Sequence, residues 1–197
     1  MAWKNLLQVI GVKSKYFVNV EIILMEGYSM ADFRKVVFSA LEEYSSDLWK
    51  KVDGLTTEEL RWQPSLGSND IQWNVWHMIR VEDTWVNKRL KSEEEIWITN
   101  GWYKQFGMKT TDHGARQSPD EVRSIPTIKM GELKEYFLEV RKSTLEYVQQ
   151  MDQNQLEKVY TENGKNGTWI IGHLLVEESQ HLGQVAYIRG IIRGFDN

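Results

Sequence analysis

Apolar residues recur at intervals of three and four along four long stretches of this chain, and this spacing limits its fold more than any other feature. In the first stretch the recurring residues are Phe33, Val37, Leu41, Tyr44, Leu48 and Val52. Such spacing places apolar side chains on one face of an α-helix. It predicts helices over residues 31–52, 69–90, 131–151 and 168–190. With no strand pattern between them, these segments favour an all-α, up-and-down four-helix bundle.

Several residues mark the expected ends of these helices. Ser68 is the predicted N-cap of the second helix and Thr168 that of the fourth, because a side-chain hydroxyl can accept a free N–H group of the first turn. Gly190 is the predicted C-cap of the fourth helix. Thr56 or Thr57, followed by two glutamates, predicts a short capped turn after the first helix.

The stretch between residues 91 and 127 lacks sustained periodicity and is interrupted by glycines and prolines. It is predicted to be a long irregular connection between the second and third helices, and connections of this length are usually functional or disordered. Trp97, Trp102, Tyr103 and Phe106 either close over a pocket or pack beneath this connection. His113, which stands beside a glycine, is predicted to be an exposed loop residue.

Composition excludes several classes of partner. The formal net charge is -4 and no basic block is present, which argues against nucleic-acid binding. No apolar run reaches the roughly 18 residues that a membrane helix needs, so no membrane partner is expected. Cysteine is absent, which fits a cytoplasmic location and requires that any metal be bound by His, Asp or Glu. The expected partners are a small-molecule substrate and a second copy of the chain in a homodimer.

Residues 1–29 are predicted to be an N-terminal extension, and residues 30–197 the helical domain. Met25, Glu26 and Gly27 would be encoded by a purine-rich sequence of the kind that binds ribosomes, a few nucleotides before the codon of Met30. The hypothesis that follows is that Met30 is the natural first residue and that the extension is not native.

The fourth predicted helix contains His173, Glu177 and His181 at successive steps of four residues, which places them on one stripe of the helix. Apolar residues flank this stripe, and a carboxylate among them is costly unless a partner or a cation neutralises it. Neighbours four apart can share an ion, whereas the two histidines are separated by about 12 Å of helical rise. Either the pair 173/177 or the pair 177/181 would therefore bind.

A third ligand must come from another helix, and His77 lies in the middle of the second one. Two histidines and one carboxylate from facing helices form a three-ligand site with an open position. Zinc is the first candidate for the divalent metal, and the same ligands also suit Fe(II), Mn or Ni. In the competing interpretation the histidines satisfy hydrogen bonds in the core, and Glu177 pairs with Arg80 or another cation.

Other ionisable groups are predicted to be structural. Glu82 and Asp83 follow His77 by five and six residues and lie off its face, so they are interpreted as surface or helix-pairing charges. Arg80 and Tyr187 could contact a substrate, but packing in the core or at its rim is the commoner fate of such residues.

Two segments of the chain resemble the DinB-like superfamily, which includes mycothiol-dependent maleylpyruvate isomerases and thiol S-transferases. They are SNDIQWNVWHMIRVEDTWVNK around His77 and GTWIIGHLLVEESQHLGQ around His181. Helix order and bundle length agree over residues 30–190. Leu182 departs from the arginine that is common at this position, so no role of that arginine carries over.

The resemblance implies a four-helix bundle that binds a divalent metal through one residue of the second helix and two residues, four apart, on the last. Matched residue by residue, these ligands are His77, Glu177 and His181, and His173 lies one turn too early. Many members have histidine where Glu177 stands, while the isomerases are similar to this chain in having glutamate.

Two classes of function follow. In the first, the chain is a metal-dependent enzyme of the thiol S-transferase, isomerase or hydrolase type. Two neutral imidazoles and one carboxylate would leave a divalent ion with a net charge of about +1, which favours an anionic ligand and lowers the pKa of a bound low-molecular-weight thiol or water. In the second, the metal is structural, and the chain is a non-catalytic stress-response or interaction protein.

Overall fold

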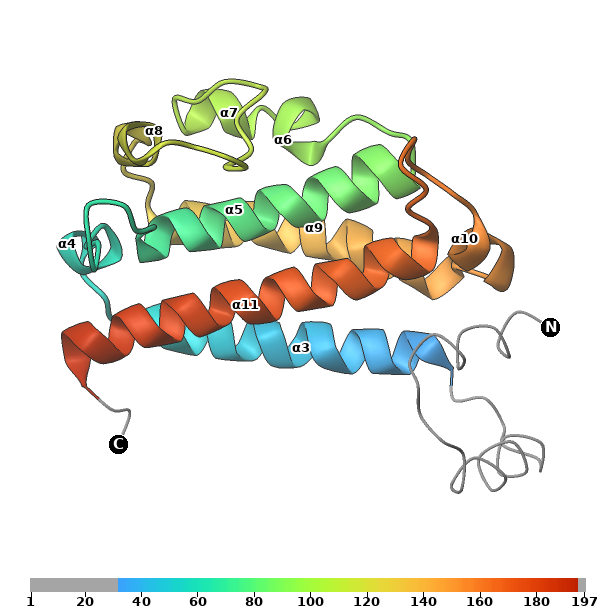
Figure 1. Ribbon diagram of the computed structural model, residues 1–197, viewed down its shortest axis with the longest axis horizontal. Coiled ribbons are helices and arrows are strands. Elements are labelled where there is room, and N and C mark those ends of the chain that lie inside the picture. The colour runs from blue at the N-terminus through green and yellow to red at the C-terminus, as the bar shows by residue number, and fades with distance from the viewer. Residues whose placement is uncertain (1–31, 195–197) are drawn as a thin grey trace, which may run out of the picture. The chain divides into compact units, whose positions relative to one another are not determined.

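The computed structural model describes residues 32–194, which form an all-helical bundle (Figure 1). The long elements are α3 (Phe33–Val52), α5 (Ile71–Asp83) with its π-helical continuation η1 (Thr84–Leu90), α9 (Met130–Gln150) and α11 (Gly167–Arg193). The short helices are α4 (Thr57–Leu60), α6 (Ile96–Thr99), α7 (Trp102–Gln105), α8 (Pro119–Ser124) and α10 (Gln153–Glu157). The predicted all-α bundle is confirmed. The proposed boundary near residue 30 falls outside the described residues and stays a prediction.

Helix α5 lies at the centre of the fold, because every one of its residues is buried. It packs along α11 on one side and along α9 on another (Figure 1). The predicted apolar faces supply the core: α3 contributes Leu41 and Leu48, and α9 contributes Leu133 and Val140. Among residues 32–194, no helix combines the length and apolar character needed to cross a bilayer.

The helix ends differ from the predicted caps by a few residues. Asp70, not Ser68, caps α5, and its Oδ1 accepts the N–H of Trp73 at 2.7 Å. Asn166, not Thr168, caps α11. That helix also continues past Gly190 and ends at Arg193, so the predicted C-cap was wrong. For both N-caps the prediction chose a residue that can cap, but a neighbouring side chain with the same ability occupies the position.

The predicted second helix is correct in extent and wrong in type over its last turns, because the helix widens into η1 after Asp83. The Asp83 carboxylate accepts the backbone N–H groups of Ile96 at 3.0 Å and Trp97 at 2.8 Å, which are the first two residues of α6. It also accepts the hydroxyl of Tyr136 on α9 at 2.7 Å. Asp83 thus joins the end of α5 to the connection that follows and to α9.

The connection between η1 and α9 is more ordered than predicted, since it contains α6, α7 and α8. Trp97, Trp102 and Phe106 are buried in the core around Tyr136, with ring centroids 5.5–6.3 Å from the Tyr136 ring. Of the two interpretations of these aromatic side chains, packing beneath the connection is therefore the one observed.

Arg141 on α9 binds three other long helices in the interior. Its guanidinium donates to the Leu41 carbonyl of α3 at 3.0 Å, to Glu82 of α5 at 3.1 Å and to Glu178 of α11 at 2.5 Å. Burial raises the pKa of Glu178 well above its usual range, and the Arg141 guanidinium opposes that effect. Glu82 is therefore a helix-pairing charge and not a surface one.

Arg141→Met is expected to lower the free energy of unfolding by about 3–5 kcal/mol, because it leaves two buried carboxyl groups without their cation. The matched control is Lys142→Met, the neighbouring residue, whose side chain is 77% exposed and forms a surface pair with Glu146. The control should change stability by no more than about 0.5 kcal/mol. Urea unfolding followed by circular dichroism measures both, and equal effects of the two substitutions would contradict the role assigned to Arg141.

Candidate metal centre

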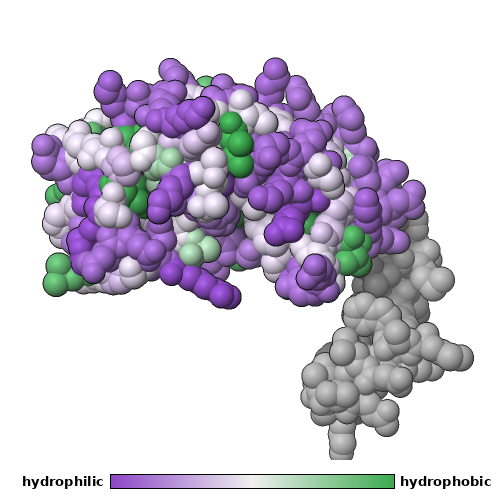
Figure 2. All heavy atoms as spheres, turned by 90° about the horizontal axis from the view of Figure 1, so that it is seen from above, coloured by the Kyte–Doolittle hydropathy of each residue, from purple (hydrophilic) through white to green (hydrophobic). Residues whose placement is uncertain are grey.

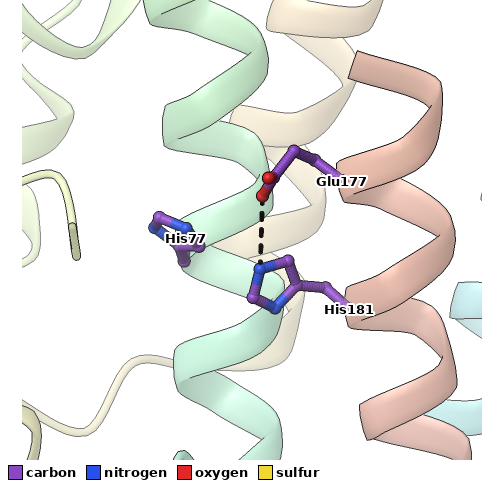
Figure 3. A group of neighbouring side chains, drawn as sticks. All are labelled: His77, Glu177 and His181. Atoms are coloured by element: carbon purple, nitrogen blue, oxygen red, sulfur yellow. Dashed lines mark ion pairs between the residues drawn. The ribbon is translucent and has the colours of Figure 1, made fainter. Parts of the chain in front are cut away.

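Helices α5 and α11 bring His77, Glu177 and His181 to one place (Figure 3). One ligand atom from each side chain lies within 4.8 Å of the other two. Nε2 of His181 is 3.6 Å from Oε2 of Glu177, one helical turn away on α11. His77 faces both from the middle of α5. The structure therefore groups the three residues that the sequence proposed as ligands.

His77 is buried, and its imidazole is oriented by the connection that covers it. Its Nδ1 lies 2.7 Å from the carbonyl oxygen of His113, so the Nδ1–H donates to that carbonyl and the Nε2 lone pair is left for an ion. The ring also stacks on Trp73, with centroids 4.5 Å apart. Burial lowers the pKa of His77 to about 3, so the ring is neutral at pH 7 and needs no deprotonation before it binds metal.

His181 is oriented in the same way by a residue of α5. Its Nδ1 lies 2.7 Å from Oδ1 of Asn74. The Asn74 amide nitrogen donates to the backbone carbonyl of Asp70 at 2.8 Å, which turns the amide oxygen toward His181. The Nδ1–H of His181 therefore donates, and Nε2 keeps its lone pair on the side of Glu177. Burial lowers the pKa of His181, and the nearby Glu177 carboxylate opposes that effect.

Glu177 is less buried than the apolar stripe suggested, since a quarter of its side chain is exposed. The cost of burying an isolated carboxylate is correspondingly smaller. The pairing of Glu177 with Arg80 that the competing interpretation offered is not observed, because the Arg80 guanidinium binds Asp83 at 3.3 Å and Glu95 at 3.0 Å in the core. The neighbours of Glu177 are the two histidines four residues away on either side.

His173 does not join the group that His77 completes. Its ring stacks on Trp169 with centroids 4.3 Å apart, and its Nε2 lies 3.7 Å from Oε1 of Glu177. The spacing left the pairs 173/177 and 177/181 open. His77 of α5 completes a three-ligand group with the pair 177/181. Tyr187, considered as a substrate contact, is 70% exposed further along α11.

The chemistry of these donors fits a divalent ion. Two imidazoles with free Nε2 lone pairs and one carboxylate are ligands of the kind that zinc and related metals accept. Both Nδ1 atoms have carbonyl-type acceptors, the arrangement that fixes the tautomer and ring orientation of metal-binding histidines.

The connection over His77 contributes more than the sequence indicated. His113 is not an exposed loop residue: its carbonyl binds His77, its ring packs edge-on against the His77 ring at 5.6 Å, and burial lowers its pKa to about 4. Gly114 has a φ of +92°. A Cβ there would overlap Nδ1 of His77 and lie 3.1 Å from the Trp73 ring. Only a glycine therefore allows the backbone to approach His77 this closely.

Comparison with known proteins agrees with this arrangement. The family model described as the DinB superfamily matches residues 40–185, well over half of the sequence and including all three candidate ligands. The chain belongs to the DinB superfamily. Membership, together with a triad that could hold an ion, supports a metal-binding DinB-like protein.

The DinB fold is also seen in a solved structure. A crystal structure of a conserved protein from Enterococcus faecalis is similar to this DinB-superfamily chain with a TM-score of 0.74 and 19% sequence identity. The similarity covers 82% of this chain and 97% of that one, and at this identity it shows the fold alone. No curated protein matches the chain.

Gly114→Ala is expected to disturb the metal centre through His77. The control is Gly107→Ala in the same connection, which also has a positive φ, of +67°, but whose added Cβ would meet only Pro126 at 3.9 Å. Both substitutions should cost roughly 1–2 kcal/mol through the backbone conformation. Gly114→Ala should in addition weaken metal binding by about 10-fold or more, because it displaces His77 from the His113 carbonyl. Isothermal titration with zinc measures this, and equal affinities of the two variants would refute the positioning role.

Proposed function

We propose that this DinB-superfamily protein is a metal-dependent enzyme, in which a divalent ion bound by His77, Glu177 and His181 activates a low-molecular-weight thiol or water for attack on a small-molecule electrophile. The observation that supports it is the convergence of three donors from two helices at a position that solvent reaches. The side chains of Glu177 and His181 are 25% and 12% exposed. A site with three protein ligands and access to solvent is the usual arrangement of a catalytic metal.

An ion held by these ligands would carry a net charge of about +1, and it would lower the pKa of a bound thiol or water toward neutrality. The chain's own residues orient the ligands. The His113 carbonyl and the Asn74 amide hold the two imidazoles, and Trp73, stacked on His77 and tilted against His181 at 5.9 Å, covers one side of the group.

The alternative is a non-catalytic stress-response or interaction protein with a structural metal. Closed structural zinc sites use four protein ligands, whereas the group found among residues 32–194 has three. A large apolar surface would favour an interaction protein. The face over α6, α7 and α8 is mainly hydrophilic, with hydrophobic residues in small separate spots (Figure 2). The three-ligand group favours the enzyme, while homodimer formation and a cytoplasmic location stay predictions.

The metal centre can be tested by elemental analysis of purified protein. Wild type is expected to contain about one divalent ion per chain, and His77→Ala and His181→Ala should lose most of it. His113→Ala is the matched control, because it removes an imidazole beside the group but leaves the backbone carbonyl that binds His77. It should keep the ion. Unchanged metal content in the two ligand variants would exclude the site.

Catalysis through a thiol can be tested by thermal unfolding with bacillithiol, mycothiol, glutathione and coenzyme A, with and without the metal. A thiol present at about 100 times its dissociation constant stabilises the folded state by about 2.7 kcal/mol, which for a chain of this size raises Tm by roughly 5–10 °C. The shift should require metal and be lost in His181→Ala. Absence of any metal-dependent shift would count against thiol activation and leave water as the activated group.

A further inference from the structure

Glu177 lies between two imidazoles, and each of its carboxylate oxygens faces one of them. Oε2 is 3.6 Å from Nε2 of His181, which belongs to the metal-binding group. Oε1 is 3.7 Å from Nε2 of His173, one turn earlier on α11. The two oxygens are therefore in different surroundings: one belongs to the metal-binding group, and the other points toward a histidine outside it.

The ring of His173 is oriented by aromatic residues and not by a ligand role. It stacks on Trp169 with an interplanar angle of 23°, and Trp85 packs edge-on against both rings, at 5.5 Å from Trp169 and 5.7 Å from His173. The Lys165 ammonium lies 3.7 Å from the centroid of the Trp169 ring. Because the stack limits rotation of the imidazole, its Nε2 stays directed at Glu177.

We propose that His173 is a positioning residue for the metal centre, which donates its Nε2–H to Oε1 of Glu177 and so presents Oε2 to the ion. The inference rests on the proposed function, because it assigns His173 a role only toward a metal-binding Glu177. A neutral imidazole carries one N–H, and the neighbouring carboxylate oxygen favours the tautomer with that proton on Nε2. The observed separation of 3.7 Å between these two atoms exceeds hydrogen-bond distance, so the bond requires the two side chains to move closer together.

This role explains why a carboxylate that is partly exposed can serve as a defined ligand. A free glutamate side chain rotates, and its two oxygens are equivalent, so it can bind an ion through either oxygen or both. A donor on one oxygen removes this freedom and leaves the other available, which is the usual contribution of groups that hydrogen-bond to metal ligands. Trp85 lies on η1, so the π-helical turn after α5 takes part in orienting the ligand.

Two substitutions separate the hydrogen bond from the packing. His173→Phe keeps a ring that can stack on Trp169 but has no N–H. His173→Gln loses the stack but carries an amide N–H at a similar distance from the backbone. Gln180→Ala, at an exposed position of the same helix, is the control. Each variant of the full chain is titrated with cobalt(II), whose visible absorption reports both affinity and coordination geometry, and circular dichroism confirms the helical content.

His173→Phe is expected to bind cobalt about 10–100-fold more weakly than wild type and to show a changed visible spectrum, while His173→Gln and Gln180→Ala stay close to wild type. Binding of His173→Phe with wild-type affinity and spectrum would overturn this inference and leave the metal centre intact. An equal loss in the Phe and Gln variants would also overturn it, because the stack and not the N–H would then matter. If wild type itself fails to bind cobalt, the proposed metal centre falls, and the role of His173 falls with it.

Discussion

The burial of α5 is the constraint on which the rest of the structure depends. Every residue of this helix is removed from solvent, although several carry polar or charged side chains. A buried polar group costs free energy unless it finds a partner, so each one determines what must lie opposite. His77 hydrogen-bonds to a backbone carbonyl of the long connection, and Asn74 accepts a hydrogen bond from His181 of α11. Arg80 donates to Glu95, and Glu82 accepts from Arg141 of α9. One helix thus specifies its neighbours on three sides.

The same pairs that stabilise the bundle also orient the candidate ligands. Asn74 accepts from His181 through its amide oxygen because its amide nitrogen is bound to the Asp70 carbonyl in the first turn of α5. The position of an imidazole on α11 therefore depends on how α5 begins. His77 in turn depends on a backbone carbonyl that reaches it only because Gly114 follows. Stability and metal binding are coupled at these residues, and substitutions there should affect both.

The helices and the candidate ligands on α11 were predictable because both follow from local spacing. Three-and-four periodicity located all four long helices to within a few residues, and steps of four identified His173, Glu177 and His181. The covering connection was not predictable in the same way. The partners of His113 and Gly114 are 36 or more residues away, and no local pattern shows which backbone carbonyl will meet His77. The partial exposure of Glu177 was missed because α11 carries apolar residues on most of its faces, both buried and exposed. The periodicity of its sequence therefore does not show which face is turned to solvent.

His173 and His181 are equivalent in the sequence, each four residues from Glu177, and the structure distinguishes them only through what faces each one. Opposite His181, α5 places Asn74, which binds its Nδ1, and His77, whose ring packs edge-on at 5.0 Å. Opposite His173, η1 places Trp85, which offers no donor atom to an ion. Because α5 and η1 follow one another along α11, the His181 ring lies against the His77 ring and the His173 ring lies against Trp85. Two histidines at equal spacing from Glu177 thus differ in role: His181 is a candidate ligand, and His173 can orient the Glu177 carboxylate.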